Sequence, residues 1–347
     1  MIYKSIRYYQ KTSWLKLAAF IVDAVNRAGL IDNYKTGNHR KYSTLFHRDF
    51  TENWTDAIRF ENFYLPYAFF KSPVELAKHL KFDKNKVPIG RLDVKLKHHN
   101  PLFSCYYGLV CFNSYNHTTQ QENLDEFLNQ VDFLNRYGIE NSNGFWLPYL
   151  EDLPKFELKA PWFAGITQAL AISVFIRAYV QTDQEIYRQR AIQLYRPLFI
   201  PVEEGGFLKN TLEGYLWIEE YPSRQPTYVL NGFVFIMIAL VEYFHEVEHT
   251  ILVKERLDKC METFFNSLHH YTFGAYTKYS RKGRTFSNIE YQGLYVFLFL
   301  HLYHLTGKSA FKELARFYNS NTDWALFFSF FQIKEGHERV EFYLRQL

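Results

Sequence analysis

The sequence predicts a mainly α protein, an (α/α) toroid of helical hairpins with a smaller N-terminal region that contains a few short strands. Helical signals recur along the chain, whereas strand signals are few. Segments that are apolar on all sides alternate with segments that are apolar on one face only. A helix of the first kind is buried and one of the second kind covers it, so the alternation predicts an inner and an outer layer of helices.

The first hundred residues, 1–100, are predicted to form a separate region of helices and short strands. Ser72 and Pro73, followed by Glu75, form a capping signal for a helix. The basic segment Lys84–His99 alternates in hydropathy, which indicates a short hairpin. Its charge is explained either by a solvated face or by contact with an acidic polymer.

Residues 101–347 are predicted to form the toroid. Thr119 and Glu122 form a second capping box, before a helix that ends at Gly138. The mostly apolar helices that follow start near residues 163, 229 and 289, so they recur at intervals of 66 and 60 residues. Charged amphipathic helices are expected between them, at about 185–196, 252–268 and 310–318. Loops at one end of the inner helices would then build a cleft.

Composition excludes several classes of protein. The net charge is only +4, which argues against a dedicated nucleic-acid protein, and 48% hydrophobic residues exclude general disorder. Three cysteines form neither a disulfide framework nor a zinc site, and the pairs His98-His99 and His301…His304 lack ligand spacing, so we expect no metal. Neither a signal peptide nor a membrane span is predicted, and we expect a cytoplasmic protein.

Aromatic residues make up 19% of the chain. Most of these rings are expected to fill the core. Rings of this kind also line carbohydrate-binding clefts, because the apolar face of a sugar stacks on them.

The segment Trp217–Pro222 is the first candidate for catalysis. Pro222 forces Tyr221 into an extended conformation. Side chains alternate along an extended run, so Glu220 should point away from Glu219 and Tyr221 unless a turn intervenes. The segment precedes an inner helix, where a Glu beside a Tyr can act as an acid/base set. The alternative is a surface acidic loop with a packed tyrosine.

A second candidate segment combines tyrosines with cations before the inner helix near residue 289. It contains Tyr271, Tyr276, Tyr279, Arg281, Lys282 and Arg284. A nearby positive charge lowers the pKa of a tyrosine, and the same cations can hold a carboxylated sugar. The alternative is an exposed loop with ordinary basic residues.

Several blocks in these segments resemble the glucuronyl C5-epimerase family that acts on heparosan and heparan sulfate. The blocks lie in the family's order between about Pro161 and Phe311. They are Ala160–Gln168 with its trailing helix to Tyr179, Trp217–Pro222 followed by Tyr228–Phe233, and Glu290-Tyr291 with its helix. The resemblance implies a toroidal catalytic domain in a compact version of the family, such as a bacterial one, that converts D-glucuronate to L-iduronate without a cofactor.

The resemblance also assigns residues. The catalytic residues it implies are Glu220, Tyr221, Tyr279 and Tyr291, and those expected to bind substrate are Trp162, Gln168, Asn231, Arg281, Lys282 and Arg284. The sequence departs from the family at its Tyr-x-x-Arg element, because Lys282 is the third residue after Tyr279 and Arg281 precedes it. The expected partner is a heparosan-like polysaccharide, and family members are described as dimers, so a homodimer is expected.

The chemistry explains these residue types. The hydrogen at C5 lies α to the carboxylate, so its removal needs a base on one face, an acid on the other, and donors or cations at the carboxylate oxygens. Without the second-face acid the same carbanion would expel the C4 substituent. Two alternatives therefore remain at this point: a polysaccharide lyase or glycoside hydrolase on the same kind of toroid, and a non-catalytic polysaccharide-binding module.

Overall fold

The structure is a computed structural model that describes residues 73–92, 96–273, 276–281, 287 and 289–320. Most of the predicted region 1–100, including Ser72, therefore lies outside the described residues. So do Lys282 and Arg284 of the predicted substrate-binding set.

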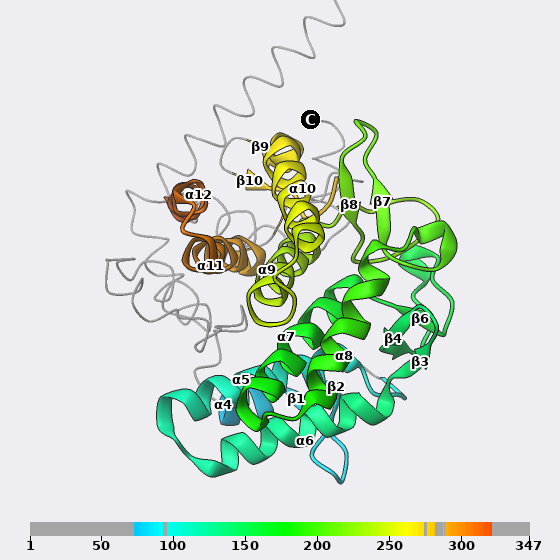
Figure 1. The fold of residues 1–347 in the computed structure, drawn as a ribbon, viewed down its shortest axis with the longest axis vertical. Coiled ribbons are helices and arrows are strands. Elements are labelled where there is room, and N and C mark those ends of the chain that lie inside the picture. The colour runs from blue at the N-terminus through cyan, green and yellow to red at the C-terminus, as the bar shows by residue number, and fades with distance from the viewer. Residues whose placement is uncertain (1–72, 93–95, 274–275, 282–286, 288, 321–347) are drawn as a thin grey trace, which may run out of the picture.

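Helical hairpins dominate the described chain and confirm the predicted alternation. The inner helices are α5 (Pro101–Thr118), α7 (Gly165–Thr182), α9 (Leu230–Glu246) and α11 (Ile289–Thr306). Each is followed by an outer helix that packs on it: α6 (Gln121–Tyr137), α8 (Glu185–Tyr195), α10 (Ile251–Ser267) and α12 (Ser309–Ser320). Neighbouring inner helices also pack on one another, α5 on α7, α7 on α9 and α9 on α11, so the hairpins follow an arc (Figure 1).

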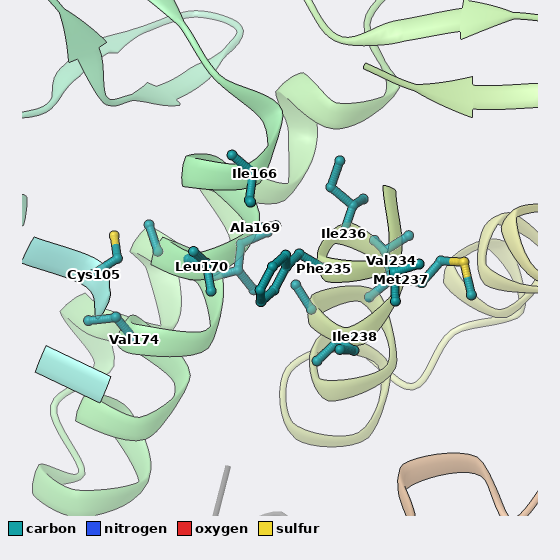
Figure 2. Packing of buried hydrophobic residues seen from close by; sticks show 14 of the residues in the cluster. Cys105, Ile166, Ala169, Leu170, Val174, Val234, Phe235, Ile236, Met237 and Ile238 are labelled. Carbon is teal, nitrogen blue, oxygen red and sulfur yellow. The ribbon is translucent and has the colours of Figure 1, made fainter. Parts of the chain in front are cut away.

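The core lies between the inner helices. Every residue from Leu230 to Phe244 in α9 is buried, as is every residue from Gly165 to Ala178 in α7. Figure 2 shows the contact between these two helices, where Leu170 of α7 lies beside Phe235 of α9. Their all-round apolar sequences are explained by this position, because α7 and α9 each have an inner helix on both sides and an outer helix behind them.

Short antiparallel hairpins connect the helices, and several lie together on one side of the molecule (Figure 1). The pairs are β1 (Leu80–Phe82) with β2 (Pro88–Arg91), β3 (Ile139–Asn141) with β4 (Gly144–Trp146), β5 (Pro148–Tyr149) with β6 (Trp162–Phe163), β7 (Leu208–Asn210) with β8 (Leu216–Ile218), and β9 (Thr272–Phe273) with β10 (Tyr276–Thr277). The remaining elements are the short helix α4 (Pro73–Ala77) and single 3-10 turns, among them η3 (Pro154–Phe156). Because β6 leads into α7 and β8 leads toward α9, these hairpins position the chain at the N-terminal ends of the inner helices.

Two local predictions were wrong in detail. Thr119 does not cap the following helix. It ends α5 in a left-handed conformation (φ 56°), and its N–H donates to the Tyr115 carbonyl over 2.7 Å. The hairpin predicted within Lys84–His99 lies further toward the N-terminus, at Leu80–Arg91. Lys86 in its turn pairs with Glu126 of α6, so this part of the basic segment is neutralised within the protein.

A buried ionic cluster joins the inner helices near their C-terminal ends. Arg177 of α7 donates to both carboxylate oxygens of Glu242 in α9, over 3.1 and 2.9 Å. His301 of α11 lies 3.8 Å from the same carboxylate. All three side chains are at most 3% exposed. A buried charge is costly without a partner. Removing Arg177 or Glu242 alone would therefore leave a buried charge unpaired and destabilise the packing of the inner helices.

Among the described residues, no helix is long and apolar enough to cross a membrane. The three cysteines, Cys105, Cys111 and Cys260, are buried free thiols.

Candidate active site

The candidate site is built where the chain leaving β8 passes between the first turns of α7 and α9. The Gly165 N–H at the start of α7 donates to the Glu220 carbonyl over 2.9 Å. Gly232, in the first turn of α9, allows an equally close approach, because a Cβ atom there would lie 2.6 Å from the Glu220 Cβ and would overlap its carboxylate. Both helices therefore have a glycine in the first turn, where Glu219 and Glu220 approach them.

Glu219 and Glu220 have different roles. Glu219 is fully buried and accepts hydrogen bonds from the Thr227 hydroxyl (2.6 Å) and from the Thr227 and Tyr228 N–H groups (3.0 and 3.1 Å). Both of its oxygens are used to hold the turn that leads into α9. Glu219 is therefore a structural residue.

Glu220 faces the site. Its side chain is 4% exposed, and its Oε2 has no hydrogen-bond partner among the described residues. Burial raises the pKa of Glu220 to about 7, against the lowering effect of Tyr221 and of the Gly232 N–H at the start of α9. A carboxyl group with this pKa can accept or donate a proton near neutral pH.

The expected alternation of side chains does not hold at this point. The chain bends at Glu220 and Tyr221, which brings the two side chains together instead of placing them on opposite sides. The Tyr221 hydroxyl interacts electrostatically with the Glu220 carboxyl group and with the Tyr279 hydroxyl. Burial raises the pKa of both tyrosines well above the usual value, so both are neutral hydroxyl donors in this structure.

Tyr291 completes the group. It lies in the first turn of α11, and its ring meets that of Tyr279 edge to face, with 5.0 Å between ring centroids. The structure thus brings together all four residues that the sequence analysis named as catalytic. They come from three separate segments: the chain after β8, the chain after β10, and α11.

Two of the predicted substrate-binding residues border this group. Trp162 of β6 lies 6.1 Å from Tyr221, between ring centroids, and stacks on Tyr149 at 4.2 Å. Asn231 follows the first residue of α9, is 5% exposed, and its Oδ1 has no hydrogen-bond partner among the described residues. A buried acceptor without a donor is costly, so Asn231 is suited to receive a hydroxyl group of a ligand.

Two others have different roles. Both ends of the Gln168 amide are occupied by backbone, because its Oε1 accepts from the Leu147 N–H (3.1 Å) and its Nε2 donates to the Phe145 carbonyl (2.9 Å). Gln168 therefore holds the strand segment that precedes the site, and its contact with substrate stays a prediction.

Arg281 forms a two-point ion pair with Glu213 and is 17% exposed. Its charge is already matched within the protein, and its role in binding substrate stays a prediction.

The sequence analysis missed one contact of the site. The ring of Phe156 is stacked on Tyr221, with 4.1 Å between centroids and 15° between planes. Phe156 lies in a charged loop with no periodic pattern, so no local signal singles it out. In the described residues, no cluster of metal-ligating side chains is found.

Comparison with known protein families assigns the chain to one of them. The family model described as "D-glucuronyl C5-epimerase C-terminus" matches residues 143–320, just over half of the chain. The chain belongs to this family. The match contains every residue of the candidate site.

Individual relatives agree with this assignment. An uncharacterized protein of Methanocaldococcus jannaschii is 31% identical over 165 residues, which are 46% of this chain and 52% of that protein. The D-glucuronyl C5-epimerase of Caenorhabditis elegans is 30% identical over 106 residues, which are 30% of this chain and 17% of that enzyme. The similarity thus spans about half the length of the archaeal relative and a smaller part of the nematode enzyme.

A solved structure confirms the fold class. The cellobiose 2-epimerase from Bacillus thermoamylovorans B4167 superposes with a TM-score of 0.51 at 13% identity, covering 78% of this chain and 72% of that chain. At this identity the likeness concerns the (α/α) fold alone. Membership of the glucuronyl C5-epimerase family is what supports the prediction of an isomerase that acts on carbohydrate.

Proposed function

We propose that this protein is a glucuronyl C5-epimerase that converts D-glucuronate to L-iduronate within a heparosan-like polysaccharide. The observation that carries the proposal is the convergence of Glu220, Tyr221, Tyr279 and Tyr291 at the N-terminal ends of α9 and α11. An inversion at carbon needs one proton acceptor and one proton donor on opposite faces. Titratable groups held by separate elements are suited to that requirement.

The reaction begins with removal of the C5 proton. In our proposal the Glu220–Tyr221 pair takes this proton on one face of the sugar. The electron pair of the C–H bond moves into the carboxylate and produces an enediolate-like dianion. Because burial raises the pKa of Glu220 to about 7, the proton can be held there without a large cost at neutral pH.

The second step returns a proton to C5 from the opposite face. Tyr291 is the donor in our proposal, since it belongs to α11, whereas Glu220 and Tyr221 lie on the chain before α9. Its phenolate then serves as the base of the reverse reaction. The role of Tyr279 is to donate a hydrogen bond that stabilises developing negative charge.

The substrate carboxylate needs donors as well. Glu213 already neutralises Arg281, so we expect a donor nearer to Tyr221, such as the Tyr279 hydroxyl, to meet it first. Lys282 and Arg284 remain predictions for the same role.

The competing activities would give different products from the same polysaccharide. A lyase would produce unsaturated chain ends, and a hydrolase would need a second carboxylate about 5–9.5 Å from the first. Glu219 is unsuited to that second role, because Thr227 and Tyr228 occupy its oxygens. A binding module would hold the polymer without exchanging any proton.

The test is to incubate the protein with heparosan in heavy water and to observe uronate C5 by NMR. Deuterium at C5, iduronate signals and unchanged chain length are expected. Intact polymer without exchange, on heparosan and on a sulfated analogue, would refute the proposal in favour of a binding module. Shortened chains would refute it in favour of a lyase or hydrolase.

Two further parts of the proposal concern the whole protein. We expect a homodimer, which light scattering of the purified protein would test. A cytoplasmic location is likewise expected, and fractionation of the source cells would test it.

A further inference from the structure

We propose that the loop between β5 and β6, residues 150–161, forms a second binding subsite, in which Phe156 and Lys155 hold the part of an anionic polysaccharide next to the reacting uronate. This inference rests on the proposed function, because it assigns a role in binding the same substrate. The catalytic steps described above do not use either residue.

The loop has a defined conformation that its own hydrogen bonds hold. Its two sides are joined by backbone hydrogen bonds in both directions between Leu153 and Leu158, of 2.8 and 3.2 Å. Asp152 accepts hydrogen bonds from the Ala160 N–H (3.0 Å) and from the Lys159 ammonium group (2.6 Å). These contacts form a closed turn, with Lys155 and Phe156 in the 3-10 turn at its tip. The backbone at the tip is therefore held in place before any ligand binds.

The base of the loop is also held. Glu151 accepts hydrogen bonds from the backbone N–H groups of Lys97 and His98, the latter over 3.0 Å. The Glu151 carbonyl accepts from the Trp162 indole N–H over 2.8 Å. The loop is thus tied both to the chain that precedes α5 and to the aromatic residues beside the site.

Phe156 links the loop to the catalytic group. Its ring lies parallel to that of Tyr221 at 4.1 Å, and both side chains are half-buried. A row of neighbouring rings therefore passes through the site, from Tyr149 and Trp162 to Tyr221 and Phe156. Phe156 is the ring of this row that lies on the loop, and its half-buried side chain can contact the apolar face of a sugar beside the site.

Lys155 adds a positive charge to the loop beside Phe156. Its ammonium group lies 5.2 Å from the centroid of the Phe156 ring, and the side chain is exposed. No carboxylate among the described residues forms an ion pair with it, whereas Lys159 on the same loop pairs with Asp152. The ammonium group therefore lies beside the Phe156 ring and is available to a carboxylate of the substrate chain.

The expected consequence is that the protein binds longer oligosaccharides more tightly than short ones. A short oligosaccharide that fills only the catalytic group would not reach Lys155, but a longer one would. The expected gain is small for the ion pair, because the side chain is solvated. The gain is larger for Phe156, whose removal also exposes Tyr221.

The experiment compares Lys155→Gln, Lys159→Gln and Phe156→Leu with the unaltered protein. Binding of heparosan oligosaccharides of increasing length is measured by calorimetry, and C5 exchange is measured by NMR on the same samples. We expect Lys155→Gln to weaken binding of long chains about two- to fivefold and to leave short ones unchanged. We expect Phe156→Leu to weaken binding about threefold or more, and to raise KM more than it lowers kcat. The matched control Lys159→Gln should bind as the unaltered protein does.

The outcomes separate this inference from the proposed function. Equal binding by all four proteins, with C5 exchange intact, would overturn the subsite and leave the epimerase proposal standing. Binding that changes as expected without any C5 exchange would support the subsite and overturn the epimerase. If the unaltered protein bound no oligosaccharide of any length, both would be overturned. A loss of binding by Phe156→Leu is interpreted only if its thermal unfolding matches that of the unaltered protein.

Discussion

Glu220→Gln should remove a pH dependence of stability that the buried carboxyl group creates. Burial raises the pKa of Glu220 from 4.5 to about 7. The folded state therefore binds the proton more tightly than the unfolded state does, so folding becomes less favourable as the pH rises from 4.5 to 7. With these two values, the carboxyl group lowers the free energy of unfolding by about 2.5 kcal/mol between pH 5 and pH 8.

The assay is urea unfolding of both proteins at several pH values from 5 to 8. The difference in the free energy of unfolding, variant minus unaltered, should grow by about 2.5 kcal/mol across this range. Any constant cost of the buried amide cancels in that comparison. Glu213→Gln is the matched control, because Arg281 lowers the pKa of Glu213 to about 2, and its carboxyl group is ionised in both states above pH 5. Parallel curves for Glu220→Gln and the unaltered protein would refute the interpretation of Glu220 as a carboxyl group that takes up a proton near neutral pH.

Four further outcomes are expected. Tyr291→Phe should abolish C5 exchange in the NMR assay with unchanged calorimetric binding of heparosan, and full activity would contradict its role as proton donor. Gly232→Ala should lower the rate of exchange about a hundredfold, because the new methyl group displaces the Glu220 carboxylate, while the far-ultraviolet circular dichroism stays the same. Gln168→Leu should lower the free energy of unfolding by about 3 kcal/mol, since two buried backbone groups lose their partner, and should leave KM unchanged, which a residue that binds substrate would not. Glu242→Gln should cost about 3–5 kcal/mol in urea unfolding because it leaves Arg177 buried without its counter-charge, and replacing both residues by apolar ones should cost less.

The helical layers are the part of the fold that the sequence predicted well. The three apolar segments form inner helices that begin and end within about one turn of the predicted positions. This succeeded because burial on all sides requires an apolar sequence on all sides. The helix at Pro101–Thr118 was not recognised as an inner helix, since its polar residues interrupt the apolar pattern.

The candidate site was predictable in its residue types but not in its geometry. The blocks shared with the family single out Glu220, Tyr221, Tyr279 and Tyr291 in the sequence. That Tyr221 lies between Glu220 and Tyr279 is a consequence of a bend which alternation along a strand does not predict. Spacing alone also could not distinguish Glu220, which faces the site, from Glu219, which holds a turn.

The sequence by itself determined the class of fold, the two layers of helices and the set of residues able to move a proton. These properties are local, because each depends on the side chains of one segment or on a short motif. The tertiary structure alone decided which polar side chains are free to act. Gln168 and Arg281 have the residue types of a binding site, yet partners 21 and 68 residues away in the chain occupy them. Such pairings depend on how distant segments meet, so no pattern within either segment records them.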